Sequence, residues 1–463
     1  MKHINEAKIN NLLEKQKHIT DIELNKILEK SKSLQRLTLE EAAGLLSVTS
    51  EEGIQKILDT ACYVKDKIYG RRVVLFAPLY ITNTCINKCR YCSFNADNSL
   101  IKRKTLSIKE IKEQTEILLK KGHKRILLVA GEGFNPDRSA VDYYIEAINA
   151  IYSVRIGKDK IRRININCAP LNVEEFKKLK ASGIGTYQLF QETYHQETYD
   201  YVHISGPKKD ADNRMDAIDR AFAGGIDDLG IGVLYGLYEY KFETLALLMH
   251  VEYLENKYNV GPHTISVPRI EPAAGAEFTK NIPHELSDEE FKKTVAILRL
   301  AVPYTGLILS TRETPEVRDE LLNIGVSQMS AESKTSPGGY KSGENEEEIA
   351  TQFSLNDHRS LDEVIGAILE KDYTPSFCTA CYRSSRTGEA FMNLAKPGII
   401  KGKCKLNALI TLKEYLDDFA SPEVKKKGYT LINKEKDKLN LKEKEQLSHF
   451  FEDIDKGLRD EYI

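Results

Sequence analysis

Three cysteines are closely spaced in the segment TNTCINKCRYCSF. Cys85, Cys89 and Cys92 form a C-x3-C-x2-C pattern just after an apolar run that begins at Val73. Structural zinc takes four ligands, and no fourth cysteine or histidine follows at zinc-finger spacing. A [4Fe–4S] cluster held by three thiolates leaves one iron open to a substrate or cofactor. The pattern therefore indicates such a cluster, with a zinc site or a loop of free thiols as alternatives.

A second group of three cysteines lies near the C-terminus. Cys378, Cys381 and Cys404 form a C-x2-C-x22-C pattern. The spacing alone also allows structural zinc completed by a distant histidine. A chain that already carries one cluster with an open iron favours a second cluster of the same kind. The two remaining cysteines, Cys62 and Cys168, are isolated, and we expect both to be buried structural thiols.

The elements that must position these cysteines follow a regular pattern from residue 71 onward. Eight short apolar runs begin near positions 73, 125, 164, 186, 230, 264, 307 and 326, and an amphipathic helical pattern follows each of the first seven. Apolar strands bounded by helices indicate a parallel sheet that is buried on both faces. Eight such units over about 260 residues predict an α/β fold, the (β/α)8 barrel. A doubly wound open sheet is less favoured, because no glycine-rich dinucleotide fingerprint follows the first strand.

The chain divides into three predicted parts. Residues 1–70 are rich in lysine and glutamate with helical periodicity, which indicates a helical N-terminal extension. Residues 71–372 would form the barrel. Residues 373–463 contain the second cysteine triplet and lysine-rich helical patterns, so we expect a small, mostly helical C-terminal iron–sulfur domain.

Composition excludes several classes of protein. The 463 residues carry a formal net charge of −2, which excludes a strongly basic nucleic-acid binder. No apolar run approaches the roughly 18–20 residues of a membrane helix. The first residues lack the apolar core of an export signal. We therefore expect a cytoplasmic protein without nucleic-acid or membrane partners.

The first triplet resembles that of the radical S-adenosylmethionine (SAM) superfamily in its spacing, in its place after the first strand and in the aromatic Tyr91. In that superfamily the open iron binds the amino and carboxylate groups of SAM, and an electron from the cluster yields a 5′-deoxyadenosyl radical. The resemblance implies that Gly131 and Glu132 hold the SAM ammonium group. It also implies that Tyr91, Glu192 and Arg214 contact SAM. The alternatives are a solvated loop acid at Glu132 and an ordinary ion pair at the barrel rim.

Longer motifs resemble the [FeFe]-hydrogenase maturases of the tyrosine-lyase type. They include FQETYHQETYDYVH, VGPHTISVPRIEPA, STRETPEVRDELL, QMSAESKTSPGGY and the C-terminal triplet. This resemblance implies cleavage of the Cα–Cβ bond of L-tyrosine to p-cresol and dehydroglycine, followed by formation of CO and cyanide on an auxiliary cluster. The barrel is also similar to 2-iminoacetate synthase, a tyrosine lyase that lacks the second triplet. A non-catalytic iron–sulfur carrier or scaffold is a further alternative.

The same resemblance assigns further residues and partners. The auxiliary cluster would carry an extra iron held through a free cysteine, with His263 as a protein ligand to that iron. Arg312 and Ser330, which end the seventh and eighth apolar runs, would bind the tyrosine carboxylate. The alternatives are a structural hydrogen bond for His263 and rim packing for the other two. The implied partners are an electron donor such as ferredoxin or flavodoxin and a scaffold GTPase of hydrogenase maturation.

Overall fold

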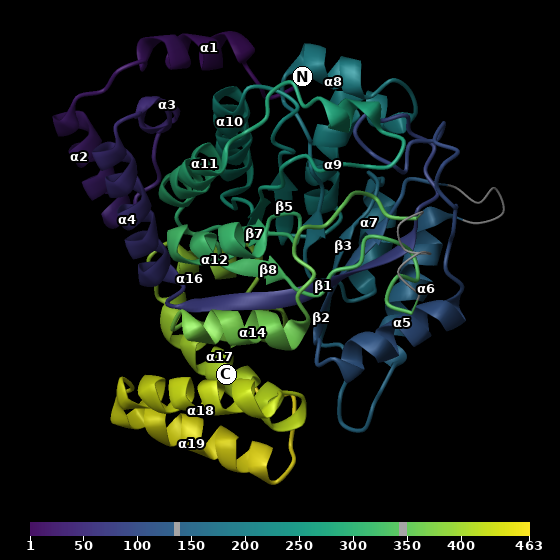
Figure 1. Cartoon of the computed structure of the whole chain (residues 1–463), viewed down its shortest axis with the longest axis vertical. Coiled ribbons are helices and arrows are strands. Elements are labelled where there is room, and N and C mark those ends of the chain that lie inside the picture. Colours follow the sequence, from purple (N-terminus) through teal and green to yellow (C-terminus); the bar gives the residue numbers. More distant parts are fainter. Residues whose placement is uncertain (134–138, 342–349) are drawn as a thin grey trace.

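A closed ring of parallel strands forms the centre of the molecule (Figure 1). The computed structural model describes residues 1–133, 139–341 and 350–463. Each barrel strand pairs in parallel with the next one along the chain, and β8 pairs with β1 to close the ring. The prediction of a (β/α)8 barrel is therefore confirmed. The barrel strands are β1 (Arg72–Thr82), β2 (Arg125–Ala130), β3 (Arg163–Asn167), β4 (Tyr187–Gln188), β5 (Leu229–Gly232), β6 (Thr264–Ser266), β7 (Gly306–Leu309) and β8 (Gln328–Ser330).

Helices surround the strands on the outside. Capping boxes start several of them, as at Ser107 with Glu110 and at Ser287 with Glu290, where each pair satisfies free amide groups of the first turn. An extra short helix, α8 (Gln196–Val202), follows β4. The other surrounding helices are α5 (Ile108–Lys120), α6 (Ala140–Ser153), α7 (Val173–Ala181), α9 (Ala211–Ala223), α10 (Tyr240–Tyr258), α11 (Asp288–Ala301), α12 (Pro315–Ile324) and α14 (Leu361–Glu370).

The N-terminal residues form a helical layer on one side of the barrel (Figure 1). The layer packs on α10 and α11, which explains why apolar residues cover almost the whole circumference of α10. None of the described helices has the length and apolar character needed to cross a membrane. The layer consists of α1 (Glu6–Lys15), α2 (Asp21–Lys32), α3 (Leu39–Ser47) and α4 (Glu51–Ile68).

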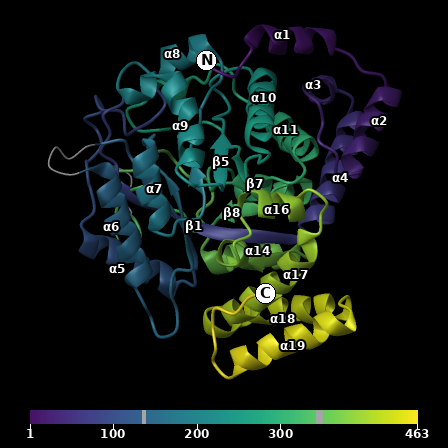
Figure 2. The same cartoon turned by 180° about the vertical axis from the view of Figure 1, so that it is seen from behind.

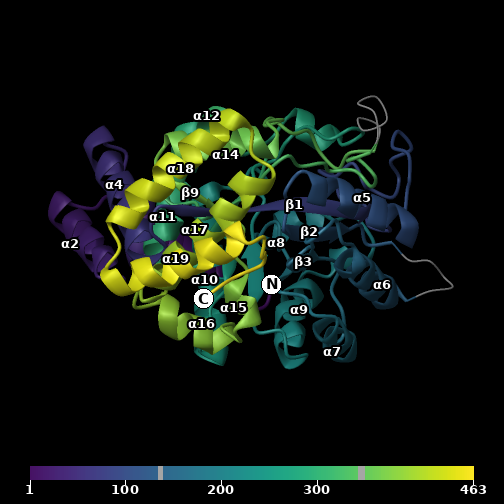
Figure 3. The same cartoon turned by 90° about the horizontal axis from the view of Figure 1, so that it is seen from below.

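The C-terminal residues attach to the barrel through a ninth strand, β9 (Thr374–Ser376). This strand pairs in parallel with Arg72–Val74, the first residues of β1. Figures 2 and 3 show the last helices as a separate layer outside the barrel, and this layer packs on α14. The helices of this part are α15 (Ala380–Arg383), α16 (Gly388–Ala395), α17 (Ile400–Asp418), α18 (Pro422–Asp437) and α19 (Leu441–Asp455).

Strand β1 connects the two cysteine triplets. Its first residues pair with β9, which directly precedes Cys378, and its last residue, Thr82, directly precedes the loop that contains Cys85. An eleven-residue strand spans roughly 35 Å at the usual rise per residue. The two triplets therefore lie at opposite ends of the barrel.

Candidate active site and second cysteine centre

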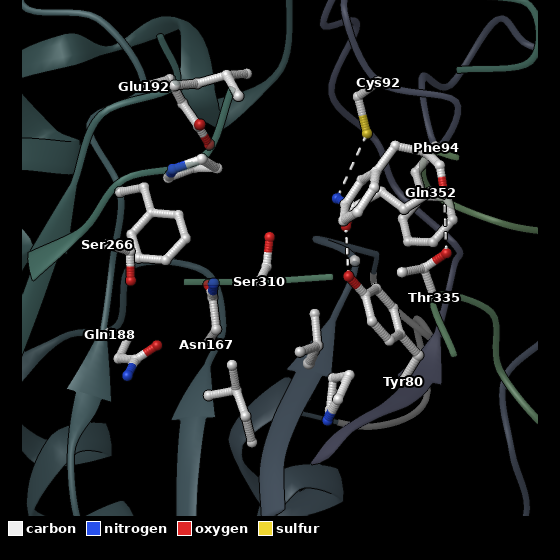
Figure 4. A pocket seen from close by; sticks show the side chains of 18 of the residues that line it. Tyr80, Cys92, Phe94, Asn167, Gln188, Glu192, Ser266, Ser310, Thr335 and Gln352 are labelled. Atoms are coloured by element: carbon white, nitrogen blue, oxygen red, sulfur yellow. Dashed lines mark hydrogen bonds between the residues drawn. The ribbon is translucent and has the colours of Figure 1, made fainter. Parts of the chain in front are cut away.

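A cavity of about 220 Å³ opens at the carboxyl ends of the barrel strands. Cys85, Cys89 and Cys92 all line it. Figure 4 shows the cavity wall near Cys92, where polar side chains from several strands point inward. This is the end of a (β/α)8 barrel where enzymes of this fold hold their reacting groups.

Hydrogen bonds from side chains organise the loop that carries the first triplet. The guanidinium group of Arg103 donates to backbone oxygens on both sides of the triplet, including those of Asn83 and Phe94 at 2.8 Å each. The amide nitrogen of Asn87 lies 3.7 Å from Sγ of Cys85 and donates to Oε2 of Glu132 at 2.6 Å. The loop is therefore tied both to itself and to the end of β2.

The sulfur positions fit a cluster better than a single ion. All three cysteines of the first triplet are free thiols. Tetrahedral zinc–thiolate sites place sulfurs about 3.8 Å apart, as Zn–S bonds of about 2.3 Å require. Among the described residues, the one set of three potential donors lying within 4.8 Å of one another is His3, Asp216 and Asp219. The three sulfurs of neither triplet all lie within that distance of one another, and three soft thiolates suit an iron–sulfur cluster.

The residues predicted to contact SAM line the same cavity. They include Tyr91, whose hydroxyl bonds Nε2 of His203 at 2.8 Å. A Cβ atom on Gly131 would lie 2.5 Å from the backbone oxygen of Thr84, so only glycine allows β2 to end this close to the cysteine loop. The complete set is Tyr91, Gly131, Glu132, Glu192 and Arg214.

Glu192 has an uncommon backbone conformation, and its side chain lies beside two cations. Its φ of 73° lies in the left-handed region, which few non-glycine residues adopt. Oε1 of Glu192 lies 2.7 Å from Nζ of Lys208 and 3.8 Å from a guanidinium nitrogen of Arg214. Burial by itself would raise the pKa of Glu192, but the charges of Lys208 and Arg214 outweigh it and leave this pKa below its usual range. The site therefore keeps an ionised carboxylate facing the cavity.

The opposite wall offers groups for a substrate carboxylate. Arg312 lines the cavity, and its guanidinium carbon lies 3.4 Å from the ring centroid of Phe353. Ser330 also lines the cavity, and its buried Oγ makes no hydrogen bond within the described part of the chain. Ser333 likewise lines the cavity, and its buried Oγ makes no hydrogen bond within the described residues. Both buried hydroxyl groups therefore have hydrogen-bonding capacity left for a ligand in the cavity.

A second, smaller cavity of about 50 Å³ lies at the other end of the barrel. Cys378, Cys381, Cys404 and His263 all line it. A guanidinium nitrogen of Arg72 donates to Sγ of Cys404 at 3.2 Å. Three thiols, an imidazole and a cation that compensates thiolate charge form a donor set that fits an iron–sulfur cluster with additional metal.

The structure thus brings the predicted residues together in two groups. Both residues proposed for the tyrosine carboxylate and all those proposed for SAM share the large cavity, and His263 shares the small one. Cys168 is buried as expected, and it lines the large cavity. The expectation for Cys62 was wrong, because its position on α4 leaves it partly exposed.

Sequence reasoning missed several residues that contact the predicted ones. Most of them meet a predicted residue that lies 16 or more positions away along the chain, so no local pattern marks them. Lys208 was detectable only as a lysine close before the helix that carries Arg214. The missed residues are Asn87, Lys208, Asp228, Ser333, Gln352 and Phe353.

Comparison with known families agrees with this geometry. The sequence model of the radical SAM superfamily matches residues 79–250, and that of the biotin and thiamin synthesis associated domain matches residues 266–374. The 2-iminoacetate synthase of Escherichia coli (strain K12) is 30% identical over 341 residues, which cover 73% of this chain and 86% of that protein.

Two solved structures resemble the whole chain. One is a crystal structure of HydG, a maturase of the [FeFe]-hydrogenase, with a TM-score of 0.95, 47% identity and complete coverage of both chains. The other is the HydG maturase from Carboxydothermus hydrogenoformans, with a TM-score of 0.82 and 40% identity. That match covers 97% of this chain and all of the other.

Proposed function

This chain belongs to the HydG family of [FeFe]-hydrogenase maturases, within the radical SAM superfamily, and on that premise we propose that it is a radical SAM tyrosine lyase. The reaction would cleave the Cα–Cβ bond of L-tyrosine to p-cresol and dehydroglycine. Dehydroglycine would then give CO and cyanide at the second cysteine centre, for assembly of the hydrogenase H-cluster. The observation that carries this proposal is the presence of two cysteine-lined cavities at opposite ends of one barrel.

Cys85, Cys89 and Cys92 would hold a [4Fe–4S] cluster. Cys378, Cys381 and Cys404 would hold a second cluster, with His263 binding an extra iron. When bound, the first cluster and SAM supply the electron and the radical chemistry, and the second supplies iron for CO and cyanide. We assign residues 373–463 to the domain of the second cluster.

The protein's own residues would bind and orient the two small molecules. Glu132 and Glu192 present carboxylate groups to the SAM ammonium group, and Arg214 presents a cation to the SAM carboxylate. Lys208 supports this arrangement because it keeps Glu192 ionised and fixed. Tyr91 forms the cavity wall beside the cysteines.

Arg312 would bind the carboxylate of L-tyrosine, with Ser330 adding a hydroxyl donor. Phe353 supports the guanidinium face and leaves its N–H edge for a ligand. One of those N–H groups donates to the backbone oxygen of Arg269 at 3.2 Å, which fixes the side chain. With SAM and L-tyrosine bound, the filled cavity would also keep water away from the reacting atoms.

Anaerobic product analysis tests the proposal. The protein is reconstituted with iron, sulfide and cysteine, then given dithionite, SAM and L-tyrosine, and p-cresol, CO and cyanide are measured together. All three products support the maturase function. p-Cresol without CO or cyanide assigns the chain to the 2-iminoacetate synthase reaction, which the 30% identity to that enzyme favours as the second candidate. Absence of 5′-deoxyadenosine would leave an iron–sulfur carrier.

Two partners follow from this function. A ferredoxin or flavodoxin would replace dithionite as the electron donor, and a scaffold GTPase would receive the product. Each is tested by supplying the purified partner, which should restore turnover without dithionite in the first case. The purified scaffold GTPase should take up iron, CO and cyanide from this protein.

A further inference from the structure

Gln352 connects a cavity wall to the cysteine loop. Its side-chain nitrogen lies 3.7 Å from Sγ of Cys92, and its Oε1 accepts a hydrogen bond of 2.7 Å from the hydroxyl of Tyr80 (Figure 4). Gln352 follows β8 in the chain, whereas Tyr80 belongs to β1. The contact therefore exists only because the barrel closes.

The hydroxyl of Tyr80 anchors the amide of Gln352, and the sulfur of Cys92 decides which way that amide faces. Burial raises the pKa of Tyr80, so its phenol remains protonated and can donate to the amide oxygen. A thiolate accepts hydrogen bonds and donates none. The amide nitrogen of Gln352 consequently faces Cys92, because the reverse orientation would set the amide oxygen against a sulfur that has no proton to donate.

The backbone around Gln352 is held on both sides. Its carbonyl oxygen accepts a hydrogen bond of 2.8 Å from Oγ of Ser93, which directly follows Cys92. Its backbone nitrogen donates to the backbone oxygen of Thr335 at 3.1 Å. The next residue, Phe353, supports Arg312. One short segment thus contacts both the cysteine loop and the substrate wall.

We propose that Gln352 is a positioning residue that donates an N–H···S hydrogen bond to the cluster ligand Cys92, with Tyr80 anchoring its amide, and that this bond raises the reduction potential of the SAM cluster. Reduction adds one electron, and part of that charge resides on the thiolate sulfurs. An N–H dipole aimed at such a sulfur stabilises the more negative state. The inference rests on the proposed function, because it requires a cluster at the first triplet.

The test compares reduction potentials in the full-length reconstituted protein. EPR-monitored redox titration is done on the wild type, Gln352→Leu, Gln352→Glu, Tyr80→Phe and the control Thr335→Val. The control removes a hydrogen bond of the same segment, from Oγ1 of Thr335 to the oxygen of Phe353, without touching sulfur. The signal that changes when SAM is added identifies the relevant cluster.

Gln352→Leu should lower the equilibrium constant for reduction about tenfold, which equals about 59 mV for one electron. Gln352→Glu should lower it further, because a carboxylate would replace the donor, and Tyr80→Phe should lower it less. Thr335→Val should match the wild type. Equal potentials in the wild type and Gln352→Leu, both with a SAM-responsive signal, would overturn the inference.

Two other outcomes are also decisive. If Gln352→Leu does not retain its cluster, the potential of Tyr80→Phe decides, because that variant keeps the amide and loses only its anchor. An unchanged potential in Tyr80→Phe then refutes the inference. If the wild type itself gives no SAM-responsive signal, the proposed function fails. That result differs from unchanged potentials in the variants, which would refute only the role of Gln352.

Discussion

Oδ2 of Asp228 lies 3.2 Å from Nδ1 of His263. Asp228 is 1% exposed, and neither of its carboxylate oxygens makes a regular hydrogen bond in the described part of the chain. Burial lowers the pKa of His263, although the nearby charge of Asp228 opposes this effect. Nδ1 of His263 makes no regular hydrogen bond in the described part of the chain either, but a carboxylate this close is placed to orient the imidazole and leave Nε2 for a metal, as in carboxylate–histidine–metal sites.

Asp228→Asn should therefore weaken metal binding at the second centre while sparing the first. Loss of such a carboxylate typically reduces metal affinity about 10–100-fold. The measurement is a titration of the reconstituted protein with Fe²⁺, together with iron content per chain. Asp227→Asn is the matched control, since Asp227 accepts from Thr387 instead. Equal Fe²⁺ affinities in the two variants would contradict a role for Asp228.

Cys378→Ser combined with Cys381→Ser should separate the two halves of the reaction. Formation of CO should stop, because the second cavity loses two of its three thiols. Formation of p-cresol should remain largely intact, because the first triplet lies at the opposite end of the barrel. Both products are assayed in one vessel, and iron content confirms that the first cluster is loaded. Loss of p-cresol with a loaded first cluster would refute this division of labour.

Arg312→Lys should lower kcat/KM for p-cresol formation about 10–100-fold. Lysine cannot form the paired N–H contacts of a guanidinium, and hydrogen bonds to charged groups contribute about 1.5–3 kcal/mol. Ser330→Ala should cost about 2–10-fold, because it removes one hydrogen bond to the carboxylate. The comparison substrate is tyramine, which lacks that carboxylate. If both variants lower the rates with L-tyrosine and tyramine equally, the two residues do not bind the carboxylate.

Glu243 should make stability depend on pH. It is fully buried behind the turn that presents Glu192, where it accepts hydrogen bonds from the hydroxyl of Thr193 and from the backbone nitrogen of Tyr194 at 2.9 Å. Burial raises its pKa to about 8 from 4.5. The folded state then holds a proton that the unfolded state releases. The contribution of this group to the free energy of unfolding is complete below pH 4.5 and is lost as the pH rises through about 8.

The corresponding measurement is urea unfolding between pH 6.5 and 8. The free energy of unfolding of the wild type should fall across this range, by an amount on the order of a few kcal/mol in total. Glu243→Gln should flatten that slope, because glutamine is uncharged at every pH in this range and has no proton to release. Glu252→Gln, on the same helix, serves as the control. Equal slopes in the wild type and Glu243→Gln would exclude this origin.

Much of the architecture was predictable because its signals are local. The capping boxes at Ser107 and Ser287 and the apolar runs between helices depend on residues close together in the chain. The predicted strand lengths were less accurate, because the apolar run that begins at Thr186 contains only the two-residue strand β4. The partial exposure of Cys62 was also missed, because helical periodicity alone did not show where the helical layer ends.

By itself, the sequence determined the two cysteine triplets, the barrel and the residues of the recognised motifs. Ligand spacing and hydrophobic periodicity are properties of short segments. Only the tertiary structure decided that Gln352 contacts Cys92, that Asp228 contacts His263 and that Lys208 pairs with Glu192. Closing the barrel brings residues from different strands and loops together at its two ends, and no local pattern encodes which side chains then meet.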